Sequence, residues 1–326
     1  MEENQILKVE NLNISYINKD SSVKACRNVN FSLNEADSLG IVGESGSGKS
    51  TVAMGMIRLL DPKETEISGK VNFYDKDLIS LSKDEFNKIR WKEIAVVFQK
   101  SMNSLSPVHR IFEQVYDIYR VHEPKATKEK VKKIFVELLN KVNLSDRVVN
   151  LYPHELSGGM LQRISIAIAL LFNPKLLILD EATTALDVVT QGQILDEILK
   201  LEQTMKMTRI MITHDISVVA QSCNKVAIFY AGELMEFGFT KDVLKRPYHP
   251  YTMGLIDSFP SMKGDTEEIK SIPGFMPDLS KEHVGCIFKD RCPYKTNICE
   301  VKKPKETVVD NRRVYCHNIQ EISDEK

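Results

Sequence analysis

The sequence Gly43-Glu44-Ser45-Gly46-Ser47-Gly48-Lys49-Ser50 fits the pattern G-x-x-x-x-G-K-[ST], and the fold that we expect is built around it. The apolar run 39–42 before it predicts a buried strand, and 51–60 after it predicts a helix that stops at Asp61-Pro62. Backbone N–H groups of such a glycine-rich turn point at one anion, and the helix N-terminus adds positive charge. Lys49 then reaches the outer phosphates of a nucleoside triphosphate, and Ser50, next to Thr51, offers its hydroxyl to Mg²⁺. A glycine-rich surface turn is the alternative interpretation.

Composition narrows the class of protein. The chain has 326 residues, of which 42% are apolar and 27% charged, so it can bury a sizeable core. Its formal net charge of -1 gives no basic field for nucleic acid, and we expect no nucleic-acid partner. The N-terminus lacks the pattern of an export signal. The most apolar stretch, 164–172, is far shorter than the roughly 20 residues of a membrane span, so any membrane role is expected to be peripheral.

Hydrophobic periodicity divides the chain into regions of different secondary structure. Short alternating runs predict strands within 6–42 and over 69–74. From 111 to 156 the period becomes helical, with apolar residues three and four apart. These residues are Val131, Ile134, Phe135, Leu138, Leu139 and Val142.

Continuous apolar runs predict buried parallel strands further along the chain. The runs are 176–179, 210–212 and 226–230, and helices over about 188–203 and 215–222 would provide the crossovers. After about residue 246 the composition shifts to proline, glycine, cysteine and charged residues. We therefore expect an α/β domain over 1–245 with a helical subdomain over about 105–160, followed by a C-terminal extension over 246–326.

The apolar run 176–179 is followed by two carboxylates. Asp180 at the carboxyl end of a buried strand is placed to orient Mg²⁺, and Glu181 can polarise an attacking water. Alone, the pattern is weak, because a carboxylate that caps a helix gives the same sequence. Downstream of a phosphate-binding loop it predicts a site for phosphoryl transfer.

The segment Leu156-Ser157-Gly158-Gly159-Met160-Leu161-Gln162-Arg163 resembles the signature of the ATP-binding cassette (ABC) family, commonly written LSGGQ. Gly158 and Gly159 lie at a helix start, which would be a second anion-binding terminus in one chain. One nucleotide does not need two such termini from one protomer. The segment is therefore expected to cap the γ-phosphate held by a partner's loop; an ordinary helix cap is the alternative.

Other residues match this family in its order along the chain. The resemblance implies that Gln99 touches Mg²⁺ or the attacking water and senses a membrane partner, and that Asp187 communicates across a dimer. It implies that His214 contacts the γ-phosphate and that Tyr16 stacks on adenine. The implied fold is a P-loop NTPase, with a RecA-like parallel sheet core, an antiparallel β subdomain and an inserted α-helical subdomain. Glu181, His214 and Gln99 would be its catalytic residues.

Longer stretches are similar to the oligopeptide, dipeptide and nickel importers of this family. They are 98–107, 152–160, 183–188, the His249-Pro250-Tyr251-Thr252 and Ile272-Pro273-Gly274 motifs, and 285–293. This likeness implies hydrolysis of ATP with Mg²⁺ to energise peptide import. It implies as partners a homologous ATPase subunit in a heterodimer, two membrane permeases and an extracytoplasmic substrate-binding protein. The expected location is peripheral, at the cytoplasmic face of the membrane.

Four cysteines crowd the extension: Cys286, Cys292, Cys299 and Cys316. Their spacing does not match the paired C-x-x-C of structural zinc sites. It resembles the cysteine extension that holds a [4Fe–4S] cluster in some of these importers, for which four thiolates is the right number. A zinc site and reduced thiols without metal are the alternatives.

Three alternative functions differ from peptide import. Import of nickel or a metal chelate uses the same type of ATPase. A soluble cassette protein acting on DNA or ribosomes would carry heptad insertions or two cassettes in one chain, and neither occurs here. A regulatory subunit that does not cleave ATP is disfavoured by the presence of Glu181 and His214.

Overall fold

A computed structural model describes residues 4–18, 21–98, 104–182, 187–258 and 271–319. The chain divides into two compact units, one formed by 1–80 with 211–326 and the other by 81–210. The predicted boundary after residue 245 falls at the end of α8 (Thr240–Lys245), inside the first unit.

The first unit contains an antiparallel sheet, as expected for the region 6–42 and its continuation. Its strands are β1 (Gln5–Asn18), β2 (Ser21–Asn34), β4 (Thr65–Phe73) and β5 (Lys76–Asp77), in the order β2-β1-β4-β5. The sheet has a buried apolar side, because Leu12, Ile14 and Val29 alternate with polar residues and are 0% exposed. β4 begins at Thr65 rather than at the predicted Gly69.

Other strands of the same unit carry the phosphate-binding motif. β3 (Ser38–Val42) is buried throughout and pairs parallel to β9 (Lys225–Tyr230). β10 (Glu233–Phe239) returns antiparallel to β9, and the extension adds β12 (Arg312–Val314) and β11 (Thr307–Val309) beyond it. The C-terminal extension is thus hydrogen-bonded to the unit that carries the motif.

The helices of the first unit follow these strands. They are α1 (Lys49–Met56), α7 (Ile216–Ser222), α8, α9 (Pro250–Asp257), the short 3₁₀ turn η4 (Lys289–Arg291) and α10 (Asn297–Val301). β8 (Thr208–Thr213) crosses the division between the units.

The expected end of α1 at Leu60 was wrong, because the helix stops at Met56. Arg58 adopts a left-handed conformation with φ 53°. Its N–H donates to the carbonyl of Gly55 at 3.1 Å, and the N–H of Leu59 donates to Met54 at 2.9 Å. This pair of bonds is a Schellman ending, which usually has glycine at the position of Arg58. The missing glycine explains why this helix end could not be predicted.

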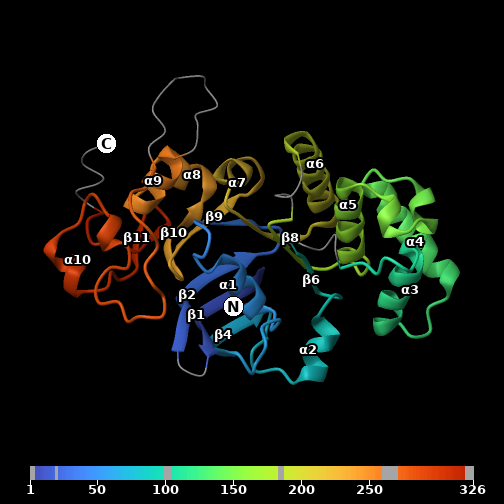
Figure 1. Ribbon diagram of the computed structural model, residues 1–326, viewed down its shortest axis with the longest axis horizontal. Coiled ribbons are helices and arrows are strands. Elements are labelled where there is room, and N and C mark those ends of the chain that lie inside the picture. The colour runs from blue at the N-terminus through green and yellow to red at the C-terminus, as the bar shows by residue number, and fades with distance from the viewer. Residues whose placement is uncertain (1–3, 19–20, 99–103, 183–186, 259–270, 320–326) are drawn as a thin grey trace. The chain divides into compact units, whose positions relative to one another are not determined.

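The second unit is mainly helical. Its elements are α2 (Lys83–Ile89), β6 (Ile94–Val97), α3 (Ile111–His122), α4 (Lys128–Lys141), the 3₁₀ turns η2 (Asp146–Asn150) and η3 (Pro153–Glu155), α5 (Gly158–Ala169), β7 (Leu176–Asp180) and α6 (Val188–Met205). β6 and β7 are parallel, with Val97 opposite Leu179. The helical insertion is confirmed, and its bundle of α3, α4 and α5 is drawn green in Figure 1.

Burial within α4 follows the predicted period. Val131, Phe135 and Leu139 are 0% exposed, while the lysines between them face solvent. Among the described residues, no helix combines the length and apolar character that crossing a membrane would require.

Candidate active site

The loop 43–48 joins β3 to α1 in the first unit. Glycine is required where backbone presses on it: a Cβ on Gly43 would lie 2.1 Å from the carbonyl oxygen of Phe229, and one on Gly48 would lie 2.5 Å from that of Ala25. Gly48 also has φ 95°, a conformation open mainly to glycine. By contrast, a Cβ on Gly46 would meet nothing within 4 Å. The loop is therefore fixed from behind and open at its tip.

Lys49 is folded back into this loop. Its ammonium donates to the carbonyls of Gly43 and Glu44, each at 2.8 Å, and approaches Ser47 Oγ at 3.5 Å. The side chain is 6% exposed and Ser47 is fully buried. A buried cation whose bonds include two neutral carbonyl oxygens is suited to an anionic ligand, because phosphate oxygens would form stronger, charge-assisted bonds.

Three further predicted residues lie near the start of α1, and a fourth lies in the loop before it. The Tyr16 hydroxyl lies 3.2 Å from Thr51 Oγ1, which places this strand residue beside the helix that follows the loop. Ser50, the second residue of α1, is half-buried, whereas Ser45 at the loop tip is exposed.

Cys26 lies under the loop and was not singled out from the sequence. Its thiol approaches the Gly48 carbonyl oxygen at 3.6 Å, and burial raises the pKa of the Cys26 thiol far above its usual range. Cys26 therefore stays protonated and acts as a packing residue.

His214 directly follows β8 and is exposed. The next residue, Asp215, caps α7 by accepting from the N–H of Ser217 at 2.8 Å. The N–H of Asp215 in turn donates to Thr213 Oγ1 at 3.0 Å. These bonds fix the strand-to-helix turn that carries the His214 imidazole.

Within the second unit, β7 ends at Asp180 and Glu181 follows it. Asp180 is 5% exposed, whereas Glu181 is half-buried and adopts φ 47°. A non-glycine residue in this region is uncommon, and such strained positions are frequent at functional sites. The turn directs the chain away from the strand immediately after the buried carboxylate.

The signature segment begins α5. Ser157 is the N-cap, and its hydroxyl accepts from the N–H of Met160 at 3.3 Å. Ser157 and Gly158 are exposed, and a Cβ on Gly159 would lie 2.9 Å from the Thr190 methyl group on α6. The helix terminus is therefore packed at Gly159 and open at Ser157.

Asp187 caps α6 in the same way. Its carboxylate accepts from the N–H of Thr190 at 2.9 Å and from the Thr190 hydroxyl at 2.7 Å. The Thr190 N–H bond is the main reason that the pKa of Asp187 lies below its ordinary value. The next residues, Val188 and Val189, are 84% and 70% exposed, which is unusual for a pair of valines.

A buried ion pair ties the signature helix to its neighbours. Arg163 on α5 contacts Glu197 on α6 at 2.8 Å, and Asn143 donates to the same carboxylate oxygen at 2.7 Å. Arg163 also donates to the Val142 carbonyl at the end of α4 at 3.3 Å. These contacts, which the sequence did not reveal, fix the direction in which α5 presents Ser157.

Some predicted site residues lie outside the described ranges. Gln99 is one of them, and residues 183–186 before Asp187 are others. Their predicted roles therefore stay predictions.

The four cysteines of the extension are free thiols, and two of their segments are joined by a backbone bond from Cys286 N–H to the Cys299 carbonyl at 2.8 Å. Burial raises the pKa of Cys286 to about 12, and the neighbouring Cys299 and Cys316 add to the rise. Burial likewise raises the pKa of Cys292 and of Cys316 to about 11. Among the described residues, no group of three or more Cys, His, Asp or Glu side chains is arranged to hold a metal ion.

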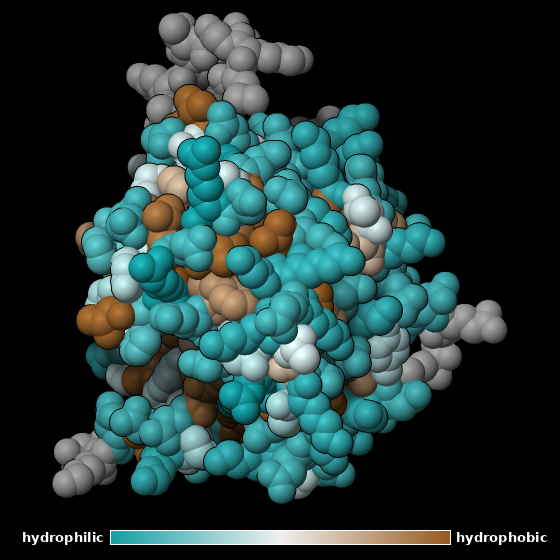
Figure 2. Space-filling view, turned by 90° about the vertical axis from the view of Figure 1, so that its right-hand side faces the viewer, coloured by the Kyte–Doolittle hydropathy of each residue, from teal (hydrophilic) through white to brown (hydrophobic). Residues whose placement is uncertain are grey.

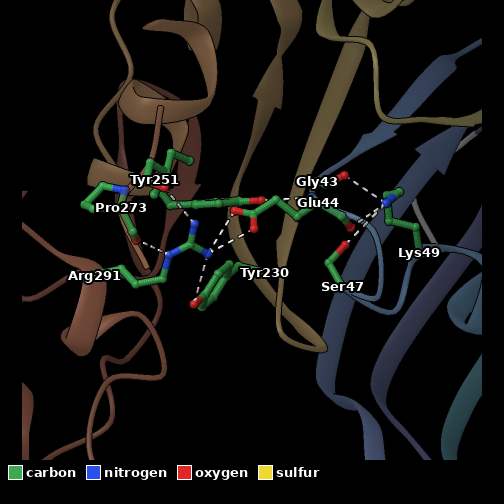
Figure 3. A network of polar contacts seen from close by, with 9 residues as sticks. Gly43, Glu44, Ser47, Lys49, Tyr230, Tyr251, Pro273 and Arg291 are labelled. Carbon is green, nitrogen blue, oxygen red and sulfur yellow. Dashed lines mark hydrogen bonds and ion pairs between the residues drawn. The ribbon is translucent and has the colours of Figure 1, made fainter. Parts of the chain in front are cut away.

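A contact that the sequence did not predict links the extension to the loop (Figure 3). Arg291 donates to both carboxylate oxygens of Glu44, each at 3.0 Å, across 247 positions of sequence. The N–H of Glu44 donates to the Tyr251 hydroxyl at 3.0 Å. No spacing signal could reveal such a long-range pair; only the motif around Arg291 hinted that the segment matters.

Comparisons with known proteins agree with this geometry. Residues 26–184 match the family described as "ABC transporter", and residues 235–299 match "Oligopeptide/dipeptide transporter, C-terminal region". The chain is 41% identical over 318 residues to the dipeptide transport ATP-binding protein DppD of Caldanaerobacter subterraneus, covering 97% of this chain and 98% of the relative. It is 40% identical to the oligopeptide transport ATP-binding protein OppD of Escherichia coli, covering 95% and 92% of the two chains.

A solved structure is similar as well. The ATP-binding cassette MJ0796, in a dimeric post-hydrolysis state bound to ADP and Pi, matches with a TM-score of 0.64 and 31% identity. The match covers 72% of this chain and 98% of that one.

Proposed function

This chain belongs to the ABC transporter family, and we propose that it is the ATP-hydrolysing subunit that energises import of oligopeptides or dipeptides through a membrane transporter. The observation that carries the proposal is the loop around Lys49, in which a buried ammonium is held by neutral carbonyls. The matching C-terminal region and the relatives named for peptide transport support the choice of cargo.

Each site residue has a proposed role in hydrolysis. The N–H groups of the loop and Lys49 bind the phosphates, while Ser50 and Asp180 would hold Mg²⁺. Glu181 polarises the attacking water, and His214 contacts the γ-phosphate. Tyr16 stacks on adenine, for which its position beside Thr51 is suitable. Gln99 contributes to the metal or water and senses the membrane partner.

We propose that a homologous ATPase subunit pairs with this chain, as a heterodimer. Ser157 and Gly158 would contact the γ-phosphate that the partner's loop holds, and Asp187 would communicate across the interface. Ser157, Val188 and Val189 are exposed, and exposed apolar side chains often mark a surface that binds a second protein. Moving an open/closed equilibrium from 1:99 to 99:1 needs about 5.5 kcal/mol. Two nucleotides that each gain about 2–3 kcal/mol from charge-assisted hydrogen bonds would supply it.

The permease partners need a contact surface on this chain. In the second unit a hollow of about 760 Å³ is lined by residues that include Lys88, Arg90, Trp91 and Val121. Figure 2 views the molecule from the side of α3 and α4, where hydrophobic patches interrupt a mostly hydrophilic surface. A basic and partly apolar hollow suits a permease segment that carries carboxylates and apolar residues. Two permeases and an extracytoplasmic binding protein complete the proposed importer, which places this chain at the cytoplasmic face of the membrane.

We further propose a [4Fe–4S] cluster as the ligand of Cys286, Cys292, Cys299 and Cys316. Support comes from the number of thiols, which is the number that a [4Fe–4S] cluster needs. Among the described residues the thiols are not arranged as a metal site, and the raised pKa values of Cys286, Cys292 and Cys316 oppose the thiolate form that ligation needs. No catalytic step is assigned to the cluster. A brown protein after anaerobic purification, with broad visible absorbance, supports it; a colourless one with intact thiols contradicts it.

Transport assays test the function directly. The chain, its partner ATPase and two permeases are reconstituted in vesicles with a binding protein, and ATP hydrolysis is measured with peptide or with a nickel chelate. Stimulation by peptide supports the proposal, whereas stimulation by the nickel chelate alone would assign the metal importer. Failure to copurify with permeases would contradict a transport role.

A further inference from the structure

We propose that Arg291 is a positioning residue for the nucleotide-binding loop, acting through Glu44. The inference rests on the proposed ATP site at Lys49. It assigns a role to a residue of the C-terminal extension that lies outside the cassette itself.

Arg291 is held in one place by the residues around it. Its side chain is 5% exposed. Besides its bonds to Glu44, Nε donates to the Pro273 carbonyl at 2.7 Å and a terminal nitrogen donates to the Ile272 carbonyl at 3.3 Å. The guanidinium also lies over the Tyr230 ring, 5.5 Å from its centre. With each of its three nitrogens engaged, the guanidinium cannot follow a moving Glu44.

Glu44 is fixed through three of its groups. Its carboxylate is bound by Arg291, and its N–H donates to the buried Tyr251 hydroxyl at 3.0 Å. Its carbonyl accepts from the N–H of Ser47 at 3.2 Å and from the Lys49 ammonium at 2.8 Å. Figure 3 shows this series of contacts from Arg291 through Glu44 to Lys49. The orientation of the Glu44 peptide therefore helps to set where the Lys49 ammonium lies.

Tyr251 and Arg291 are in turn held by residues packed around them. Tyr251 packs against Tyr230 and Phe288, with ring centres 4.8 and 5.4 Å apart. Its backbone N–H donates to His249 Nδ1 at 3.0 Å, at the cap of α9. The sequence motifs around His249, Pro273 and Arg291 thus meet at one point behind the loop. We assign to these motifs the structural task of holding Glu44.

Charge gives a second reason for the arrangement. Glu44 brings a carboxylate into a loop built for phosphates, where like charges disfavour binding. Arg291 is bonded to both of its oxygens and offsets this charge. Removing Arg291 would therefore loosen the Glu44 peptide and expose the phosphates to an uncompensated negative charge.

The experiment measures nucleotide affinity of the full-length chain with a fluorescent ATP analogue and with ADP. We expect Arg291→Gln to lower the affinity for each of the two nucleotides about tenfold. Arg291→Lys, which keeps the charge, should lower each affinity about threefold. In the reconstituted transporter the KM for ATP should rise by a similar factor, while kcat at saturating ATP changes less than twofold. Hydrogen exchange of the 43–48 peptide should be faster than in the wild type.

The matched control is Arg313→Gln. Arg313 belongs to the same extension and also faces a glutamate, Glu306 at 3.9 Å, but does not touch the loop. The nucleotide affinity of Arg313→Gln should match that of the wild type. If Arg291→Gln does not fold, Tyr251→Phe removes the other support of Glu44 and should weaken binding about threefold.

The outcomes separate this inference from the proposed function. A wild-type chain that does not bind ATP would contradict the nucleotide site itself. Wild-type binding with unchanged affinity in folded Arg291→Gln, or in Tyr251→Phe, would overturn only the role of Arg291. An equal loss in Arg313→Gln would show a general effect of the extension and would overturn it too.

Discussion

The loop 43–48 and the segment 157–159 are both helix N-termini suited to phosphate, yet the structure treats them differently. In the loop, Gly43 and Gly48 lie against backbone carbonyls, and Glu44 is held by Arg291 and Tyr251. Lys49, which follows the loop, is almost fully buried. The segment presents Ser157 and Gly158 to solvent, and the Ser157 side chain accepts the cap bond from the N–H of Met160. The loop is therefore a site prepared inside its own unit, whereas the segment is prepared for something that arrives from outside.

The largest effect should come from breaking the prepared site. Lys49→Ala removes the cation that the loop carbonyls hold. We expect nucleotide affinity to fall at least about 100-fold, because the proposed charge-assisted bonds to the phosphates are lost. Titration with a fluorescent ATP analogue measures this. Lys76→Ala, an exposed lysine of the same unit, is the control that should bind normally. Wild-type affinity in Lys49→Ala would remove this loop from the nucleotide site.

A second variant separates binding from chemistry. Glu181→Gln keeps the shape of the side chain but removes the charge that polarises water, so hydrolysis in the assembled transporter should slow by about 100-fold or more. ATP affinity should stay within about threefold, because the loop is untouched. Glu129→Gln, an exposed residue of the same unit, is the control. Near-normal turnover in Glu181→Gln would mean that another group activates the water.

The third variant tests the exposed segment 157–159. Ser157→Ala should leave ATP affinity of the isolated chain unchanged but lower ATP hydrolysis of the assembled transporter about tenfold, the effect of one charge-assisted bond. Loss of the cap should also cost about 1 kcal/mol of stability. Ser145→Ala removes a comparable cap bond of 3.3 Å in the same unit and controls for that loss. Equal activity in both variants would mean that Ser157 is only a helix cap.

The smallest effect concerns the packing behind the loop. Burial lowers the pKa of His249 to about 3, so the folded state keeps this imidazole neutral while the unfolded chain protonates it below about 6.5. The unfolded state then binds more protons as pH falls, and stability should decrease by about 1 kcal/mol between pH 7 and 5.5. Urea unfolding at both pH values measures this. His249→Asn, which can still cap α9, should lose the dependence, and exposed His154→Asn should retain it. A slope that His249→Asn leaves unchanged would assign the titration elsewhere.

Sequence reasoning succeeded where a pattern is local. The strand before Gly43, the amphipathic helix through Phe135 and the buried strand ending at Asp180 were all predicted and are all confirmed. Each depends on periodicity or on a motif of a few residues, so the neighbouring sequence contains the information. The end of α1 was missed because Arg58 takes a conformation that usually marks glycine.

The site's supporting contacts could not be predicted in the same way. The pairs Arg291–Glu44 and Arg163–Glu197 join segments far apart in the chain, and nothing in the local sequence distinguishes these charges from those on a solvated surface. Only tertiary packing brings these charges together. Gln99 lies outside the described residues, so its role is still a prediction from resemblance.

The central claim is that the exposed Ser157 of this chain completes a nucleotide site on a second ATPase subunit. The most direct measurement is a structure of the assembled transporter, with Glu181→Gln and Mg²⁺-ATP trapping the closed state. We predict that the Ser157 hydroxyl lies within hydrogen-bond distance of the γ-phosphate held by the partner's loop. A γ-phosphate contacted by one polypeptide only, with Ser157 still in solvent, would contradict the account.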